Sequence, residues 1–327
     1  MRSYLTDVPV KINIWIRPEC QSKQWEVIRK ARPSVLFLIS DGGRNETEWE
    51  AIKKNREMID SSIDWDCTVY RKYEVENCGI YTMISKYNEL VWSHVDRCIF
   101  LEDDHIPSVS FFSFCAELLE KYKDDKRIAC ICGMNHMGVY DKPKESYFFS
   151  SYMSIWGVAT WKRVYESHSL SYGDDAYQKQ LIKEELARTN KTIILDKIMN
   201  YPHNPMYGNH IAGDEFWLQH YMCTQHACSI IPKKNMINCV GATNNAAHAS
   251  DYKNMPKNIQ ALYFMKTYEI DEICHPEFVL VDSDYTKKVL KQLHNSKIMT
   301  LLRYVFTLNI SAIKDAFERK IHRNIEK

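Results

Sequence analysis

The chain has 327 residues and a mass of 38.6 kDa, with 45% apolar and 26% charged residues. This composition is ordinary for a globular protein and excludes a disordered or fibrous chain. The 43 Lys and Arg residues against 42 Asp and Glu residues give a net charge of +1, so no overall field attracts nucleic acid. The length allows two domains, or one large α/β unit with an appendage.

The sequence contains no stretch that is long and apolar enough to cross a membrane, and its N-terminal residues do not resemble a signal peptide. The longest apolar run, Val35–Ile39, is far too short to span a bilayer, and residues 1–7 lack the apolar core of a signal peptide. The 11 cysteines are odd in number and form no Cys-x-x-Cys pair, which favours free thiols in a reducing compartment over a disulfide framework. We therefore expect a soluble, cytoplasmic protein.

The first 135 residues alternate short apolar runs with longer amphipathic stretches. Strands are predicted at residues 10–16, 35–39, 67–70, 97–101 and 128–132. Helices are predicted between them, one over 21–31, one capped by Asn45 and one capped by Ser108. Strands that alternate with helices build a parallel sheet covered on both faces, so the predicted class is α/β.

Three parts are predicted along the chain. Residues 1–135 form the regular first part, and residues 136–285 form a less regular second part with helices near 174–190 and 214–226. Residues 286–327 hold ten Lys and Arg against three Asp and Glu, a net charge of +7 around an apolar centre. Such a tail suits a helix on an anionic membrane surface or one docked on the body, and the two readings are equally supported.

An acidic cluster follows the predicted strand at 97–101. Glu102, Asp103 and Asp104 come directly after it, where parallel sheets bind their ligands. Carboxylates at such a place repel one another, and Mg²⁺ or Mn²⁺ relieves the repulsion and completes its shell with water and phosphate oxygens. The alternative is an acidic turn that leads into a helix.

Several short motifs follow one another in a recognisable order. They are Ile39-Ser-Asp-Gly-Gly-Arg44, Ile63-Asp-Trp-Asp-Cys67, Glu76-Asn-Cys-Gly79, Leu101-Glu-Asp-Asp-His-Ile-Pro-Ser108 with Phe111-Phe112, and Ile155-Trp-Gly-Val-Ala-Thr-Trp161. Together they resemble bacterial glycosyltransferases of the GT-A fold, which use nucleotide sugars, often for surface polysaccharides. They are also distantly similar to the N-acetylglucosaminyltransferase that initiates complex N-glycans. The resemblance covers roughly residues 8–250.

The resemblance implies that residues 1–135 are the half that binds the nucleotide sugar and that residues 136–285 are the half that binds the acceptor and carries the catalytic base. It also implies roles for residues on the donor side of the site. Asp104 would ligate Mn²⁺ or Mg²⁺ with Glu102 in support, and Asp103 would reach the donor ribose or sugar. His248, in Asn245-Ala-Ala-His248, would add a metal or diphosphate contact, although relatives have Thr-His-Thr there. The remaining residues implied on the nucleotide and diphosphate side are Arg17, Asp41, Asn77 and Gly79. The basic residue that neutralises the diphosphate is left open among Arg17, Arg44, Arg71 and Lys72.

Inversion at the sugar needs a carboxylate base. The resemblance places this base at Asp214, with Glu215 second, and the alternative for Asp214 is a helix cap. A competing acidic pair, Asp174-Asp175, is a better helix cap than a base. Trp156 and Gly157 belong to an aromatic stretch that would form the floor of a sugar pocket, or equally part of the core.

The sequence thus predicts a metal-dependent, inverting glycosyltransferase with a nucleotide-sugar donor, UDP-sugar favoured, and a glycan or lipid-linked acceptor in bacterial surface polysaccharide synthesis. Peripheral contact with the inner face of the membrane is expected through the tail, and no nucleic acid partner is expected. Two alternatives stay open: a nucleotidyltransferase that makes nucleotide sugars, and a non-catalytic sugar- or nucleotide-binding scaffold.

Overall fold

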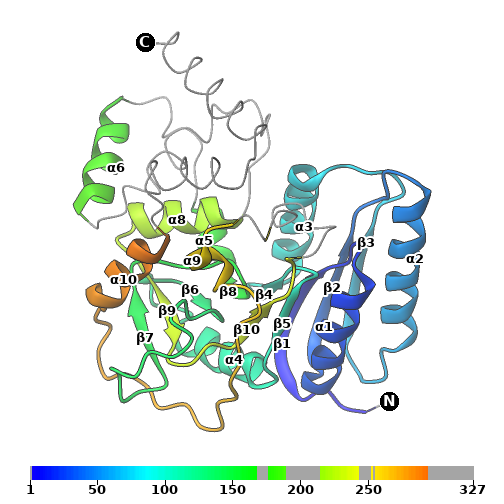
Figure 1. Cartoon of the computed structure of the whole chain (residues 1–327), viewed down its shortest axis with the longest axis horizontal. Helices are drawn as coiled ribbons and strands as arrows, with labels where there is room; N and C mark the ends of the chain where they lie inside the picture. Colours follow the sequence, from blue (N-terminus) through cyan, green and yellow to red (C-terminus); the bar gives the residue numbers. More distant parts are fainter. Residues whose placement is uncertain (1, 168–175, 189–213, 243–251, 253–254, 294–327) are drawn as a thin grey trace.

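The first half of the chain alternates strands and helices as the pattern predicts (Figure 1). The computed structural model describes residues 2–167, 176–188, 214–242, 252 and 255–293. The elements of the first half are β1 (Thr6–Asn13), α1 (Pro18–Ala31), β2 (Pro33–Ser40), α2 (Glu46–Ser61), β3 (Thr68–Tyr73), α3 (Ile80–His94), β4 (Arg97–Leu101), β5 (His105–Pro107), α4 (Ser110–Lys121) and β6 (Ile128–Cys132).

The second half adds strands to the same sheet and further helices around it. Its described elements are β7 (Tyr147–Ser150), β8 (Val158–Trp161), α5 (Lys162–Glu166), α6 (Ala176–Arg188), α8 (Asp214–Thr224), β9 (Cys228–Pro232), β10 (Ile237–Cys239), α9 (Lys257–Gln260) and α10 (Ser283–Leu293). Eight strands form one sheet in the order β3-β2-β1-β4-β8-β6-β9-β7, and β5 pairs with β10 in a separate ribbon.

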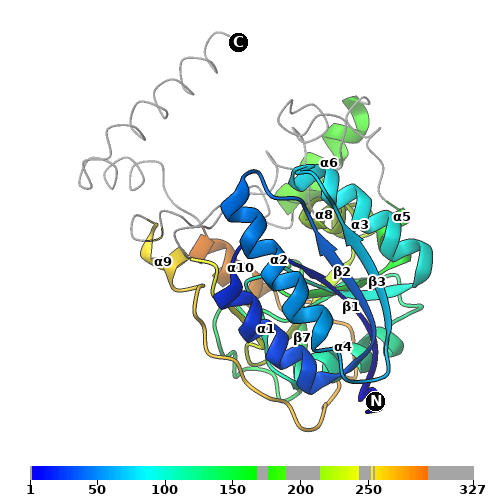
Figure 2. The ribbon, with the colours of Figure 1, turned by 90° about the vertical axis from the view of Figure 1, so that its right-hand side faces the viewer.

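The sheet is mostly parallel, which confirms the predicted α/β class. Strands β3, β2, β1 and β4 run parallel to one another, and β6 runs parallel to β9. Strands β8 and β7 are antiparallel to their neighbours, so the second half is mixed. Helices α1 and α2 lie side by side in front of β1–β3 (Figure 2).

Burial explains why these segments form strands. Strands β4 and β6 have the predicted bounds, and almost all their side chains are buried because helices and neighbouring strands cover them. β1 ends at Asn13, three residues before its predicted end, because the chain leaves the sheet to begin α1 at Pro18.

The two predicted helix caps have different outcomes. The side chain of Asn45 accepts a hydrogen bond from the Glu48 N–H at 3.0 Å, which confirms the cap of α2. The predicted Ser108 cap is wrong, because α4 begins at Ser110. The carboxylate of Glu269, 160 residues further on, accepts the N–H groups of Val109 and Ser110 at 3.0 and 2.7 Å.

Two further expectations concern thiols and membranes. All 11 cysteines are free, as predicted. No helix in the described residues combines the length and the apolar character needed to cross a bilayer. Of the predicted basic tail, the structure describes only the part up to residue 293, which belongs to α10.

Candidate active site

The parallel strands bring three separate parts of the sequence to one edge of the sheet. Ile12 of β1 is level with both Leu38 of β2 and Leu101 of β4. The chain that leaves each strand at its carboxyl end therefore emerges at the same edge. Arg17 follows β1, Asp41 follows β2, and the acidic cluster of residues 102–104 follows β4.

Arg17 joins two of these acids. Its Nε and Nη2 donate to Asp103 Oδ2 and Oδ1 at 2.9 and 2.5 Å, and its Nη1 donates to Asp104 Oδ2 at 3.0 Å. Arg17 and Asp103 are 7% and 5% exposed, so little water screens the pair. A two-point contact between guanidinium and carboxylate is strong and geometrically specific. The feature that the sequence indicated as a cluster of acids is therefore an ion-pair network.

The network has a clear charge state. Burial raises the pKa of Asp103 to about 6, and the Arg17 guanidinium limits this rise. Burial works in the opposite direction on Arg17, but the ion pairs with Asp103 and Asp104 outweigh it and raise the pKa of Arg17 above its usual value. At neutral pH, Asp103 is mainly ionised and Arg17 is charged.

Two side chains hold the turn that carries the acids. Gln24 of α1, fully buried, donates through Nε2 to the carbonyl oxygens of Glu102 and, at 2.8 Å, His105. His105 Nδ1 accepts the N–H groups of Glu102 at 3.1 Å and Gly157 at 3.3 Å. Because Nδ1 accepts, the ring proton of the neutral imidazole sits on Nε2, which lies 3.6 Å from Asp104 Oδ1. Burial lowers the pKa of His105, which favours this neutral form.

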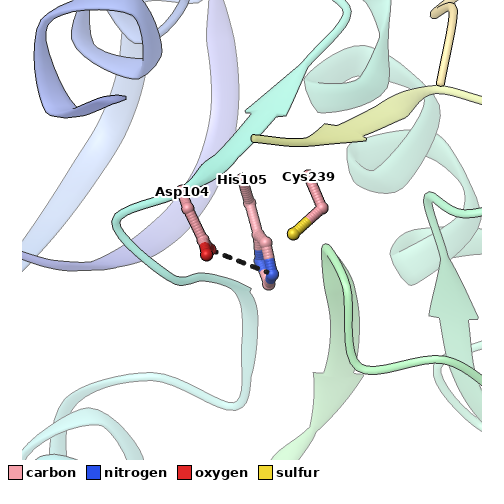
Figure 3. Close-up of side chains that lie close together, drawn as sticks. All are labelled: Asp104, His105 and Cys239. Atoms are coloured by element: carbon pink, nitrogen blue, oxygen red, sulfur yellow. Dashed lines mark ion pairs between the residues drawn. The ribbon is translucent and has the colours of Figure 1, made fainter. Parts of the chain in front are cut away.

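Within the part of the chain that the structure describes, Asp104, His105 and Cys239 form a group of three side chains that could ligate a metal. One ligand atom from each lies within 4.8 Å of the others (Figure 3). The group arises because β5 and β10 pair with His105 directly opposite Cys239. Glu102 is exposed and is not in this group, and His248 lies outside the described residues.

The chemistry of this group fits a hard divalent ion at Asp104 alone. His105 Nδ1 already accepts two N–H groups, and Nε2 would have to lose its proton to bind a metal. Burial raises the pKa of the Cys239 thiol, and thiols are soft ligands in any case. One carboxylate, with water and phosphate oxygens, is a sufficient protein contribution to a Mg²⁺ site. Asp104 would thus hold such an ion, while His105 and Cys239 shape its surroundings.

The chain after β10 closes over the acids. The Val240 N–H donates to the Asp104 carbonyl oxygen at 3.0 Å, and the Gly241 carbonyl oxygen lies 3.4 Å from Arg17 Nη1. Because this segment is more than 130 residues away in the sequence, only the fold brings it here.

Asp41 organises the loop before α3. Its carboxylate accepts the N–H groups of Gly42 and Cys78 at 2.8 Å and of Gly79 at 2.9 Å, and Asn77 Nδ2 donates to it at 3.1 Å. Gly79 has φ +80°, which favours glycine. The structure therefore brings Asp41, Asn77 and Gly79 together, with Asp41 as the organiser of the loop. Their implied contacts with the nucleotide stay a prediction.

The other basic residues implied for the diphosphate each pair with an acid elsewhere. Arg44 pairs with Glu48, Arg71 with Asp60 and Lys72 with Glu74, at 2.5, 2.8 and 3.5 Å. Arg44 also lines a pocket of about 510 Å³ at the start of α2. The lining of this pocket includes neither Arg17 nor the acidic residues 102–104.

Trp156 and Gly157 lie beside the acidic turn, next to an aromatic residue that the sequence did not single out. The Trp156 ring is 4.9 Å from that of Tyr263 and 6.5 Å from that of His105. Burial raises the pKa of Tyr263 to about 12, and the charge of Asp104 adds to this rise. These rings form one edge of the site.

Of the two residues implied as the catalytic base, the structure describes the side chain of Glu215 but not that of Asp214. Helix α8 begins at Asp214, where a helix was expected. Glu215 accepts a hydrogen bond from Gln219 at 2.9 Å, and its charge adds to the effect of burial in raising the pKa of Tyr152. The competing pair Asp174-Asp175 lies outside the described residues.

Sequence reasoning missed Gln24, Cys239, Gly241 and Tyr263. Each reaches the site through a contact distant in the sequence, and none belongs to a motif that marks it. A short apolar stretch before a glycine, as at 237–241, was the one available signal.

Comparisons with known proteins give limited similarity. No family model and no curated protein matches the chain. A structure of UDP-glucose pyrophosphorylase complexed with UDP-glucose aligns with 71% of this chain and 92% of its own, at a TM-score of 0.36 and 10% identity. A197 from STIV aligns with 53% and 75%, at a TM-score of 0.27 and 11% identity. Similarity at these TM-scores does not assign a function to the chain.

Proposed function

We propose that the chain transfers a sugar from a nucleoside diphosphate sugar, UDP-sugar favoured, to a glycan or lipid-linked acceptor in bacterial surface polysaccharide synthesis. The observation that carries the proposal is the meeting of Arg17, Asp103 and Asp104 at the carboxyl edge of the parallel strands. Ligands of open α/β sheets bind at this edge. The positive charge of Arg17 suits the diphosphate of such a donor, and the carboxylates of Asp103 and Asp104 suit its sugar hydroxyls and a divalent cation.

Each side chain has a task in this proposal. Asp104 would hold Mg²⁺ or Mn²⁺, which supplies positive charge for the departing diphosphate when bound. Asp103 accepts hydrogen bonds from donor hydroxyls, and the loop that Asp41 organises supports the nucleotide side. Trp156 and Tyr263 offer ring faces to a sugar.

The acceptor hydroxyl loses its proton to a carboxylate at the start of α8. Asp214 is our first choice for this base and Glu215 the second. With the base opposite the leaving group, the transfer inverts the configuration at the sugar carbon.

A nucleotidyltransferase is the alternative reaction on such a sheet. It would favour a glycine-rich phosphate loop after β1, and residues 14–19 contain no glycine. A non-catalytic scaffold would bind the donor and leave it intact.

One screen separates the three functions. UDP-, GDP- and dTDP-sugars are incubated with Mn²⁺ and with a panel of glycan acceptors, and released nucleoside diphosphate is measured. A second set pairs nucleoside triphosphates with sugar 1-phosphates, and pyrophosphate is measured. We expect nucleoside diphosphate release in the first set. Pyrophosphate release alone would establish the nucleotidyltransferase, and donor binding without either product would establish the scaffold.

A further inference from the structure

The guanidinium of Arg17 acts as the counter-ion of two neighbouring carboxylates. It lies between the two acids, with two N–H groups on Asp103, one on Asp104, and the Gly241 carbonyl oxygen at 3.4 Å. Burial of both Arg17 and Asp103 means that neither charge is stabilised by bulk water. The free protein therefore supplies its own counter-ion to these carboxylates.

A divalent ion and this arrangement compete for the same oxygen. Arg17 Nη1 lies 3.0 Å from Asp104 Oδ2, so an ion bound to Asp104 meets a positive charge at close range. Repulsion between the two cations would weaken the contact of Arg17 with Asp104. The guanidinium then needs another anion, and a diphosphate is the anion that accompanies the metal in the proposed reaction.

The shape and place of Arg17 suit that exchange. A guanidinium matches phosphate oxygens with parallel N–H groups as well as it matches a carboxylate. Arg17 is also the residue that precedes the first turn of α1, a helix of 14 residues, so a phosphate beside it meets the positive end of the helix dipole. The other basic residues considered for this role pair with acids outside this network.

We propose that Arg17 is the residue that neutralises the donor diphosphate, and that it reaches this role by exchange: divalent metal takes Asp104, and Arg17 turns from the carboxylates to the phosphates. This inference rests on the proposed function, because it requires a nucleoside diphosphate at this edge of the sheet. Metal and nucleotide consequently bind as a pair, and each alone binds weakly.

The experiment measures binding by titration calorimetry, with Mn²⁺ alone, UDP alone, and UDP with Mn²⁺. The variant is Arg17→Gln, and the matched control is Arg127→Gln, which removes a charge from an exposed pair with Asp125. We expect Arg17→Gln to bind Mn²⁺ alone at least tenfold more tightly than the native chain, since the competing charge is gone. It should bind UDP with Mn²⁺ at least tenfold more weakly, and Arg127→Gln should change neither.

The Arg17→Gln change leaves Asp103 buried without its partner, and the variant could fail to fold. In that case, the same comparison is made between Asp103→Asn and the double variant Arg17→Gln/Asp103→Asn, where no buried carboxylate is left unpaired. Circular dichroism checks that each variant is folded. The loss of UDP affinity on removal of Arg17 is expected in this background as well.

The outcomes separate the two proposals. UDP affinity unchanged by loss of Arg17, or lost instead in Arg44→Gln, would overturn the role of Arg17 and leave the proposed function standing. No binding of UDP, GDP or dTDP to the native chain in the presence of Mn²⁺ would overturn both. Mn²⁺ affinity that does not rise in the Arg17 variant would overturn the exchange.

Discussion

The backbone of Gly241 touches the carboxylate of Asp104 so closely that no side chain fits between them. A Cβ on Gly241 would lie 1.6 Å from Asp104 Oδ2 and 2.9 Å from Arg17 Nη1. We therefore expect Gly241→Ala to displace both charged groups. The free energy of unfolding should fall by about 1–3 kcal/mol, and the affinity for UDP with Mn²⁺ should fall at least tenfold, as measured by denaturation and calorimetry.

Gly138→Ala is the matched control for this change. Gly138 has φ +72°, and its Cβ would meet only a methionine methyl carbon, Met265 Cε, at 3.5 Å. It should cost about 1 kcal/mol through backbone strain and leave nucleotide binding unchanged. Equal binding by Gly241→Ala and the native chain would show that the site does not depend on this contact.

Gly157 allows a test of whether this position belongs to the packed core. It has φ +65°, and a Cβ there would lie 2.3 Å from Ile237 Cδ1. Gly157→Ala should lower the free energy of unfolding by about 2–4 kcal/mol, from strain and overpacking together. In the double variant with Ile237→Ala, the steric part should be relieved, so the two changes should cost less than their sum. Additive costs would contradict the packing explanation.

Asp41 should matter for the loop that it organises. Asp41→Asn replaces one acceptor oxygen with a donor that faces backbone N–H groups of residues 78 and 79. We expect a loss of about 1–3 kcal/mol in the free energy of unfolding, together with weaker nucleotide binding. Asp60→Asn, which breaks an exposed pair with Arg71, should change stability by less than about 1 kcal/mol. Equal losses of stability in Asp41→Asn and Asp60→Asn would show that the hydrogen bonds of Asp41 do not hold the loop in place.

Buried histidine makes the fold sensitive to acid. Burial lowers the pKa of His136 to about 4, against about 6.5 in an unfolded chain. Protons therefore bind the unfolded chain first as the pH falls below 6.5, and the folded state loses stability until the pH reaches about 4. Between pH 7 and pH 5 the loss from this residue should be about 2 kcal/mol. His105 acts in the same direction.

The variant His136→Gln isolates the contribution of this residue. Urea denaturation at pH 7 and pH 5 should show a smaller difference in stability for the variant than for the native chain. An identical difference in both proteins would mean that His136 does not cause the acid sensitivity.

The base at the start of α8 can be tested by a pair of isosteric changes. Asp214→Asn should keep the donor affinity and reduce transfer by at least a hundredfold, because no carboxylate remains at this position to take the proton from the acceptor hydroxyl. Glu215→Gln should have a smaller effect on turnover. Full turnover in Asp214→Asn and loss in Glu215→Gln would move the base to Glu215; full turnover in both would place it elsewhere.

The sequence predicted the sheet well where burial is continuous. The strands at 97–101 and 128–132 have the predicted bounds, because an apolar run bounded by polar residues leaves one arrangement that buries it. The cap of α2 was also predictable, since Asn45 and its partner are three residues apart. Where the partner is distant, prediction failed, as with Glu269 in place of Ser108 at the start of α4.

The site divides in the same way. By itself, the sequence determined that three carboxylates follow a buried strand, and that Arg17 and Asp41 follow two others, because each of these facts is local. The tertiary structure alone decided that Arg17 pairs with Asp103, 86 residues away, that Cys239 faces His105, and that Gly241 covers Asp104. Local periodicity records which side chains are buried, whereas the partner of a buried charge depends on how distant strands are ordered in the sheet.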